Sequence, residues 1–439
     1  MSASTLLAEL LSSPPVDGGR APLSRDDLRE VLVIAMRAGQ LMLENGANTA
    51  RVEETIDRIG TALGAQGLEV FVTPTGIIVT GVARGEHRTR IQRIVRTGID
   101  LGRVAAVIDV SRRAEARLLD REGVRAELER IAVRPREYGP LPTTLAVALA
   151  CASSSMLFGG GWRESLAALL ASGAAFFPRA WLAEHFPSRL FVISLIAALG
   201  SALGMLLAQL LGATALAPTL LGSVLFLVPG LLMVSSTADL FRGDTISGMA
   251  RAVSAALVLA AIGAGMWMVL IVSGMRADLE TSGPPNLLAA LLLAPLAASG
   301  FAVMFNVPRR ALVYGAAVGA LAYVIRLVTQ NLGSPPEVAI FLGGAMIGLC
   351  GEVLARLLRL PTVLFTIPGF ITLVPGTTAF RSLLDFVNAR YNDGTEHLIR
   401  AALLTAALAA GLGTINAFAR LRRPHEKPGV VARTSTTQR

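Results

Sequence analysis

Histidine and cysteine are scarce in this chain of 439 residues. It contains 4 His and 2 Cys, with no Cys-x-x-Cys pair and no Cys/His cluster of the kind that holds a metal ion or a redox disulfide. Cys151 and Cys350 both fall in apolar segments, where cysteine packs as a small hydrophobic residue. We therefore expect no metal, no cofactor and no catalytic residue.

Charged residues are also few, at 16%, whereas hydrophobic residues make up 53% of the chain and the mean hydropathy is +0.59. This composition is typical of a membrane protein with many spans in the lipid bilayer. Residues 1–140 hold 20 Arg and 19 acidic residues, so the net charge of +9 belongs almost wholly to the remainder. A charge carried by the membrane part is a poor argument for nucleic acid as a partner.

The first thirty residues lack the basic segment and apolar run of a signal peptide, so we expect the N-terminal region to stay in the cytoplasm. Residues 1–24 are rich in Ser, Pro and Gly, which predicts disorder. The periodicity of residues 25–138 predicts a small cytosolic α+β domain. Its expected helices cover residues 25–45, 49–63, 101–119 and 124–133, and its expected strands cover 68–74, 75–82 and 89–96.

Ten apolar segments follow, which predict an all-α membrane bundle of about ten transmembrane helices. They divide into two repeats of five, residues 139–280 and 281–420, before a disordered cytoplasmic tail at 421–439. An odd number of spans per repeat makes the repeats inverted, and the excess of Arg in alternate connections predicts that both termini lie in the cytoplasm. The segments are 141–158, 164–177, 190–211, 215–235, 249–273, 286–305, 311–329, 337–354, 361–380 and 398–418.

One stretch occurs twice: VLFLVPGLLMVSSTADLFR at 224–242 and VLFTIPGFITLVPGTTAFR at 363–381, identical at seven of nineteen positions. A Pro-Gly pair breaks a membrane helix, and paired broken helices indicate the substrate site of a transporter. Helix starts would bind a carboxylate, and free carbonyl and hydroxyl groups would bind an ammonium group. Simple kinks, satisfied by neighbouring Ser and Thr, are the alternative. The candidate substrate-binding residues are Pro229, Gly230, Ser235, Ser236, Thr237, Pro368, Gly369, Pro375, Gly376, Thr377 and Thr378.

Two acidic residues near segment ends, Asp239 and Glu352, are candidates for carrying a coupling proton, since desolvation favours the protonated form of a carboxyl. In the alignment above Asp239 faces a neutral counterpart, Thr378, which predicts that only one repeat carries the proton. The alternative for Asp239 is an acid at a helix end that pairs with Arg242.

Two motifs stand out in the predicted cytosolic domain. Arg51, Glu53 and Glu54 lie at the start of the second expected helix, where capping and pairing within the helix explain them without a further function. Thr73-Pro74-Thr75-Gly76 separates two expected strands. A hairpin turn is favoured over a small anion-binding nest.

The chain resembles the bacterial threonine/serine exporter family over about residues 30–420. The resemblance rests on AGQLMLENGANTARVEETIDRIGTALG, VFVTPTGIIVTG and GIDLGRV in the N-terminal part, and on FNVPRRALVYGAAVGALAYVIR and IPGFITLVPGTTAFR in the second membrane half. It implies export of L-threonine and L-serine from the cytoplasm, driven by the proton-motive force, with the N-terminal domain required. The resemblance also implies a bacterial inner membrane. Asn48 stands where the resemblance leads us to expect an acidic residue.

Two other functions stay open. Similar two-subunit systems, which divide between the fifth and sixth segments, look like dicarboxylate (succinate) exporters, and Arg326 and Arg381 would suit a second carboxylate. A membrane-tethered hydrolase or transferase needs a nucleophile and a base within reach, and none is evident, so we do not expect an enzyme. The expected partners are a small-molecule substrate, protons and the bilayer, and a homo-oligomer stays open.

Overall fold

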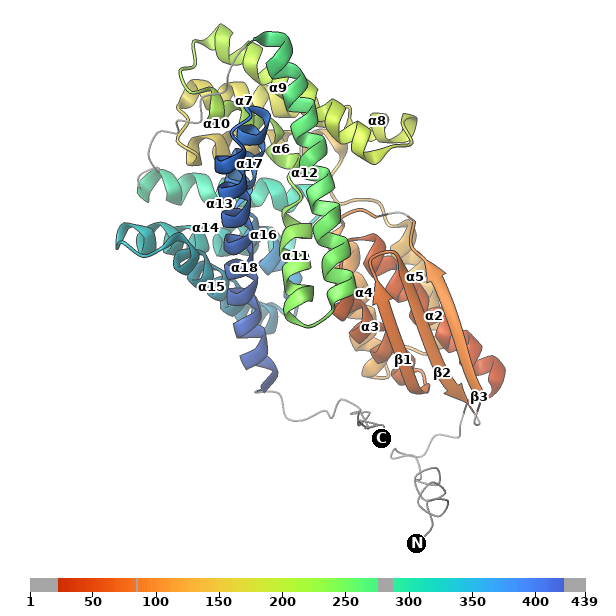
Figure 1. Ribbon diagram of the computed structural model, residues 1–439. Helices are drawn as coiled ribbons and strands as arrows, with labels where there is room; N and C mark the ends of the chain where they lie inside the picture. The colour runs from red at the N-terminus through yellow and green to blue at the C-terminus, as the bar shows by residue number, and fades with distance from the viewer. Residues whose placement is uncertain (1–22, 84–85, 96, 275–286, 422–439) are drawn as a thin grey trace, which may run out of the picture.

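The computed structural model describes residues 23–83, 86–95, 97–274 and 287–421, and places a mixed α/β region beside a larger helical part (Figure 1). We call residues 23–139 the N-terminal region. The disorder expected for residues 1–24 and 421–439 concerns segments that lie almost wholly outside the described ranges.

Local capping explains where the helices of the N-terminal region begin. Ser24 accepts a hydrogen bond from the amide of Asp27 and closes a capping box, and Asn48 accepts one from the amide of Arg51; such side chains satisfy amides that lack a partner within the helix. Asp100 and Asp120 cap two later helices in the same way. The expected helices are confirmed as α2 (Arg25–Glu44), α3 (Thr49–Ala62), α4 (Leu101–Glu115) and α5 (Arg121–Val133).

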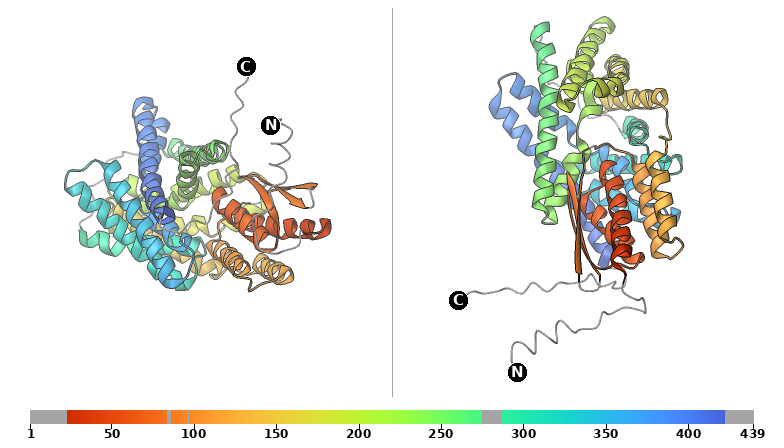
Figure 2. Two further views of the ribbon diagram at one scale, coloured as in Figure 1. Left: turned by 90° about the horizontal axis from the view of Figure 1, so that it is seen from below. Right: turned by 90° about the vertical axis from the view of Figure 1, so that its right-hand side faces the viewer.

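Three strands form an antiparallel sheet in the order β1-β2-β3, namely β1 (Gln66–Thr73), β2 (Gly76–Ala83) and β3 (Glu86–Arg93). Thr73 pairs with Gly76 across a two-residue turn, so the hairpin expected at Thr73-Pro74-Thr75-Gly76 is confirmed. Alternate residues of β2, including Ile77 and Val79, are buried, as in any strand with one covered face. Helices α2 and α3 cover that face, with α4 and α5 behind them (Figure 2).

The helical part is built from long apolar helices. Among the described residues, eight helices are long and apolar enough to cross a membrane, and a ninth results if Leu216–Leu227 and Gly230–Phe241, bent by 66°, form one span. The expected count of ten is not confirmed, because segment 361–380 consists of two short helices. The elements are α6 (Pro140–Leu157), α7 (Trp162–Phe176), α8 (Arg179–His185), α9 (Arg189–Leu211), α10 (Leu216–Val224), η1 (Leu225–Leu227), α11 (Gly230–Phe241), α12 (Thr245–Ser273), α13 (Leu287–Met304), α14 (Arg309–Asn331), α15 (Pro336–Leu358), α16 (Val363–Ile371), α17 (Gly376–Val387) and α18 (Tyr391–Leu421).

The order of these elements recurs at a nearly constant difference in residue number, which we call the repeat offset. It is 147 between Gly159 and Asn306 and between Gly212 and Arg359, and 146 between Gly243 and Ala389, and all six residues have positive φ. Helices α13, α14 and α18 begin one repeat offset after α6, α7 and α12, to within a single position. Helices α12 and α18 run in opposite directions in Figure 1.

The second Pro-Gly break of the C-terminal half is the one that matches the first half. Helix α11 begins after Pro229 (φ −82°, ψ 50°), and α17 begins one repeat offset later, after Pro375 (φ −74°, ψ 46°). Pro368 lies inside α16. The ungapped alignment of Pro229 with Pro368 is therefore wrong as a guide to where the helices break.

Close packing against α14 explains why a helix tolerates Pro368. A Cβ built on Gly315 would lie 3.3 Å from Pro368, and one built on Gly319 would lie 3.5 Å from Gly369. The two glycines of α14 thus let α16 approach closely at its proline. The Pro368-Gly369 pair serves helix packing in this structure.

The two matched breaks contact each other reciprocally. A Cβ built on Gly230 would lie 3.1 Å from Val374, and one built on Gly376 would lie 3.5 Å from Val228. Val228 and Val374 are themselves separated by the repeat offset. An exchange of equivalent contacts of this kind is what a two-fold relation between the halves produces.

The N-terminal region is joined to the helical part by backbone bonds at the α13–α14 turn. The amides of Leu101 and Gly102 donate to the carbonyls of Phe305 (2.9 Å) and Asn306 (3.1 Å). The Asn306 amide group donates to both carboxylate oxygens of Asp100, each at 2.9 Å. The apolar core of the region continues into this contact and includes Phe305, Val307, Leu364 and Phe365.

Replacing Asn306 should weaken this junction. Asn306→Gly keeps the backbone freedom needed at φ 56° but leaves the buried Asp100 without two hydrogen bonds, so we expect a loss of about 1–3 kcal/mol. Asn306→Ala should lose about 1 kcal/mol more, because of its Cβ. Thermal unfolding of the full chain in detergent measures both, with exposed Asn331→Ala as the control. A glycine variant as stable as the wild type would contradict the role assigned to the amide.

Candidate functional site

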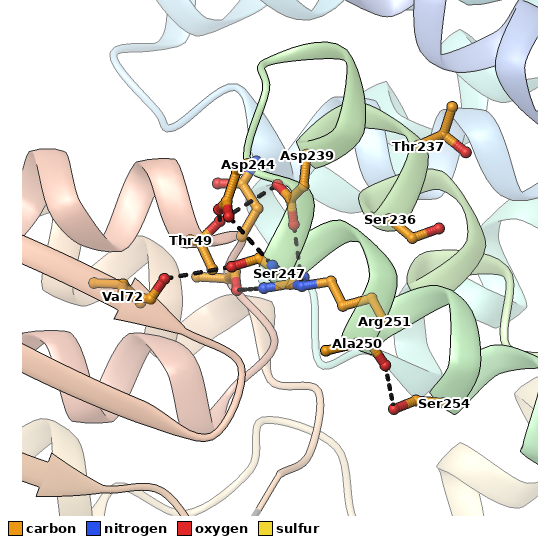
Figure 3. A network of polar contacts seen from close by, with 12 residues as sticks. Thr49, Val72, Ser236, Thr237, Asp239, Asp244, Ser247, Ala250, Arg251 and Ser254 are labelled. Atoms are coloured by element: carbon orange, nitrogen blue, oxygen red, sulfur yellow. Dashed lines mark hydrogen bonds and ion pairs between the residues drawn. The ribbon is translucent and has the colours of Figure 1, made fainter.

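A polar cluster lies where the N-terminal region meets the α11–α12 hairpin (Figure 3). The loop between α2 and α3 supplies Ala47, the start of α3 supplies Thr49, and the hairpin supplies Asp239, Asp244 and Arg251. We call these five residues, with Ser247 and Val72, the inner cluster. It joins segments that lie far apart in the sequence.

Asp239 and Arg251 form a buried ion pair at its centre. Arg251 Nε lies 3.2 Å from Asp239 Oδ2, and the side chains are only 7% and 1% exposed. Neither of these two atoms has a hydrogen-bond partner among the described residues, so charge rather than directional bonding holds them together. A buried charge without its partner destabilises a protein by about 3–5 kcal/mol, and each residue therefore depends on the other.

Close packing of two helices places this pair. A Cβ built on Gly248 of α12 would lie 2.6 Å from Leu240 of α11, so only glycine permits this approach without displacement. Asp244, in the turn, caps α12 by accepting from the amide of Ser247 at 3.2 Å. The turn and the glycine together hold Asp239 opposite Arg251.

The N-terminal region covers the pair with long hydrogen bonds. The single hydroxyl proton of Thr49 is shared between Asp244, whose oxygen lies 3.1 Å from Oγ1, and Asp239, whose oxygen lies 3.4 Å from it. Arg251 Nη2 donates to the Ala47 carbonyl at 3.3 Å, and Ser247 Oγ donates to the Val72 carbonyl at 3.4 Å. These lengths are at the weak end of the range for hydrogen bonds, which suits a contact that separates.

Glu53 adds a third carboxyl group to this side. Its Oε1 accepts from the amide of Val72 at 3.2 Å. Burial raises the pKa of Glu53, and the nearby Asp244 and Asp239 raise that pKa further. Three acidic groups thus lie close together beside Arg251, and Arg242 also acts electrostatically on Asp239.

Two of the hydroxyl groups predicted to bind substrate donate to a carbonyl of their own helix. Ser236 and Thr237 donate to the Met233 carbonyl at 2.8 and 3.2 Å and lie away from the inner cluster (Figure 3). Ser235 is buried, Thr378 is half-buried, and the side chain of Thr377 lies outside the described part. The structure brings the Pro229-Gly230 and Pro375-Gly376 breaks together and leaves Pro368-Gly369 against α14.

The remaining candidates lie elsewhere. Glu352 pairs with Arg356 one turn away on α15, at 2.9 Å, and Glu54 pairs with Arg58 at 2.7 Å. The amide of Arg51 donates to Asn48, so asparagine caps α3 where an acidic residue was expected. Within the described ranges no group of three His, Cys, Asp or Glu is placed to hold a metal ion.

Sequence reasoning missed a second pair, Asp385 and His397. The His397 Nδ1 atom lies 2.8 Å from Asp385 Oδ2, and the side chains are 28% and 2% exposed. The repeat offset relates this pair to Arg251 and Asp239, so the counterpart of Asp239 is Asp385, and the expected counterpart Thr378 is wrong. The signal was present as the duplicated spacing Ser-x2-Asp-x8-Gly-x2-Arg/His, starting at Ser236 and at Ser382.

Two family models match consecutive parts of the chain. One, described as "Putative threonine/serine exporter", matches residues 33–273, and the other, described as "Threonine/Serine exporter, ThrE", matches residues 290–418. The boundary between them falls between α12 and α13, where the order of elements begins to recur.

Curated proteins similar to the chain carry two kinds of name. The "Probable succinate transporter subunit YjjP" of Escherichia coli (strain K12) is 30% identical over 256 residues, 58% of this chain and 99% of that protein. The "Threonine/serine exporter" of Corynebacterium glutamicum is 24% identical over 445 residues, 96% of this chain and 89% of that protein. The "Probable threonine/serine exporter" of Mycobacterium tuberculosis is 25% identical over 420 residues, 91% and 79% of the two chains. No solved structure matches the chain.

The raised pKa of Glu53 predicts a stability that falls with pH. The folded state binds this proton more tightly than the unfolded state, whose carboxyl titrates near 4.5; stability is therefore lost as pH rises from there through the folded pKa. Glu53→Gln keeps the acceptor for Val72 and removes the charge. We expect it to be more stable than the wild type at pH 8, by up to about 1 kcal/mol since the group is half-exposed, and equal near pH 4.

Thermal unfolding in detergent across this pH range measures the difference. Glu54→Gln is the matched control, because Glu54 is more exposed and pairs with Arg58. A Glu53→Gln variant that differs from the wild type equally at pH 4 and pH 8 would contradict the assignment.

Proposed function

The chain belongs to the threonine/serine exporter family, and from this premise we propose that it exports small amino acids, L-threonine and L-serine, from the cytoplasm, driven by the proton-motive force. The observation that carries the proposal is the reciprocal contact between the breaks at Pro229-Gly230 and Pro375-Gly376. Paired broken helices are a recurring way to bind small charged substrates within a membrane.

The substrate site is placed where these breaks meet. The first amides of α11 and α17, those of Gly230 and Gly376, donate to the carbonyls of Val228 (2.9 Å) and Val374 (2.7 Å). The amides that follow them in the first turn are the ones a helix leaves without a partner, and the positive ends of both helix dipoles favour a carboxylate. Carbonyl groups before each break suit the ammonium group of the same amino acid. Backbone groups would thus bind both the carboxylate and the ammonium group of a zwitterionic amino acid. Neighbouring residues would select its side chain.

We propose the division into inverted repeats, residues 139–280 and 281–420, after a cytosolic domain at 25–138. The recurrence of helix starts and of positive-φ residues at the repeat offset supports it. So does the direction of α12 against α18 (Figure 1). The fourth and ninth segments are then the two broken helices of a ten-segment arrangement.

Contacts of the N-terminal region support one orientation for the whole chain. Three connections of the bundle lie against this region. Arg189, at the start of α9, donates to Thr97 at 3.1 Å, and Arg136 of the region donates to the Met304 carbonyl at the end of α13 at 2.6 Å. Leu358 and Leu360, at the end of α15, pack on the core of the region. One side of the bundle thus faces this region. We place that side in the cytoplasm of a bacterium with an inner membrane.

The inner cluster is proposed to close the cytoplasmic side. Asp239 was expected to carry the coupling proton, but Arg251 lies 3.2 Å away and keeps its charge at every physiological pH. A carboxylate paired with a permanently charged arginine is better suited to holding the cytoplasmic side closed than to carrying a proton. The N-terminal region acts as a cover on this pair, which gives a physical reason for its being required.

A dicarboxylate exporter is the second candidate function. The 30% identity to a protein named as a succinate transporter subunit favours it. So does Arg326 on α14, whose Nε atom is buried without a hydrogen-bond partner among the described residues. A guanidinium group there could bind a second carboxylate.

Counterflow in proteoliposomes distinguishes the two functions. Vesicles loaded with unlabelled threonine should accumulate labelled threonine and serine at least about tenfold above protein-free vesicles, whereas succinate-loaded vesicles should not accumulate labelled succinate. Exchange needs no net proton movement, so it tests the substrate apart from the driving force. Accumulation of succinate alone would replace the proposed substrate with a dicarboxylate.

Locking the cover should stop transport. In a chain with Cys151 and Cys350 replaced by Ala, we expect a short thiol-specific cross-linker between Thr49→Cys and Asp244→Cys to reduce counterflow by at least about tenfold, and a reductant to restore it. Each single-cysteine variant treated in the same way is the control. Full exchange by the cross-linked protein would show that the cover stays in place during transport.

A further inference from the structure

The two ends of the bundle carry equivalent ionic pairs with one chemical difference. Asp239 and Arg251 lie on α11 and α12, and Asp385 and His397 lie at the same positions of α17 and α18, one repeat offset later. The surrounding geometry repeats as well. A Cβ built on Gly394 would lie 2.8 Å from Phe386, as one on Gly248 would lie 2.6 Å from Leu240.

The pairs lie at opposite ends of the helical part. The α11–α12 turn is beside the N-terminal region, whereas the α17–α18 turn lies at the far end (Figure 1). The inner pair is covered, and the imidazole of the other pair is 28% exposed above a carboxylate that is 2% exposed. The proposed orientation thus puts the second pair on the side of the membrane opposite the N-terminal region.

We propose that Asp385 and His397 form a proton-binding site on the outer side, and that proton uptake there makes transport respond to the external pH. This rests on the proposed function and adds the group that senses the proton. In the neutral ring Nδ1–H donates to Asp385 Oδ2, and Nε2 takes a proton from the external solution. The product is an imidazolium–carboxylate pair, the equivalent of Arg251 with Asp239.

The difference between the arginine of one pair and the histidine of the other decides which side of the membrane responds to pH. A guanidinium group is charged at all physiological pH values, so the inner pair is ionic throughout. An imidazole is charged only after it has bound a second proton, so the outer pair is fully ionic only in that form. An acidic exterior thus strengthens closure of the outer side without changing the inner side directly.

Other charged groups lie on the elements around the outer pair. Those on α17, on α18 and in the turn between them are Arg381, Arg390, Asp393, Glu396 and Arg400. The helices packed against these two are α11, α12 and α15, and their charged residues are Asp239, Arg251, Glu337, Glu352 and Arg356. Within the described residues of these five helices, His397 is the one histidine, and the carboxylate it contacts is Asp385.

Transport at controlled external pH tests the site. Threonine-loaded proteoliposomes are placed in buffers of pH 5.5 to 8, and initial counterflow rates are measured. The wild-type rate should change by about tenfold or more over this range, as the protonated fraction of an imidazole does. His397→Arg, which copies the inner pair, should exchange threonine with less than about twofold variation. The control is His185→Gln. His185 lies on α8 and contacts the carbonyl and the ring of Trp181, so this variant should keep the wild-type profile.

A wild-type pH profile in His397→Arg overturns the proposal. If His397→Arg exchanges no threonine, a measurement on the wild-type protein decides the outcome. Hydrogen–deuterium exchange at the imidazole carbon follows the titration of His397 alone. Titration between pH 5 and 8 that is altered in Asp385→Asn supports the site, and a histidine that stays in one form across this range overturns it. Wild-type vesicles that exchange no amino acid would refute the proposed substrate instead, and leave the titration result standing.

Discussion

The arrangement of the whole chain depends on the burial of one charge, the carboxylate of Asp239. A carboxylate that is 1% exposed needs a partner, because an unpaired buried charge costs several kcal/mol. Arg251 supplies the opposite charge, but a guanidinium group has five donors to satisfy. The Ala47 carbonyl accepts from one of these donors, and Thr49 donates to the carboxylate. The inner end of the bundle is therefore complete only when the N-terminal region is docked.

Glycine and proline position this pair by controlling how closely helices approach. Gly248 brings α12 against α11, and Gly230 and Gly376 let the two halves meet at their breaks. The prolines before Gly230 and Gly376 each end one helix and set the direction of the next. A Cβ at Gly248 would lie 2.6 Å from Leu240 and one at Gly230 would lie 3.1 Å from Val374, so a side chain at either position would push apart helices that meet near the proposed site.

Much of the local structure could be predicted, because capping and periodicity are local. Ser24 and Asn48 begin their helices where the sequence indicates, and the Thr73–Gly76 turn joins two strands. The register of the repeats could not be predicted by identity alone. Apolar residues around Pro368 resemble those around Pro229, yet the break that matters follows Pro375. The identical residues around Pro229 and Pro368 reflect the apolar composition of membrane helices. The equivalent polar residues, Asp385 and His397, lie beyond the aligned stretch.

The docking of the N-terminal region lay outside what sequence could supply, since its contacts join residues that are far apart along the chain. Its consequence is an asymmetry between two otherwise equivalent ends. A ligand or domain shifts a two-state equilibrium only by its differential contacts with the two states, and these contacts exist on one side alone. They favour the state in which the inner end is closed. In the proposed orientation an exporter loads from that end, so the cover must be able to open there. At the α11–α12 hairpin it is held by hydrogen bonds of 3.1–3.4 Å, which are long for their type, whereas its apolar contact lies with the α13–α14 turn and α16.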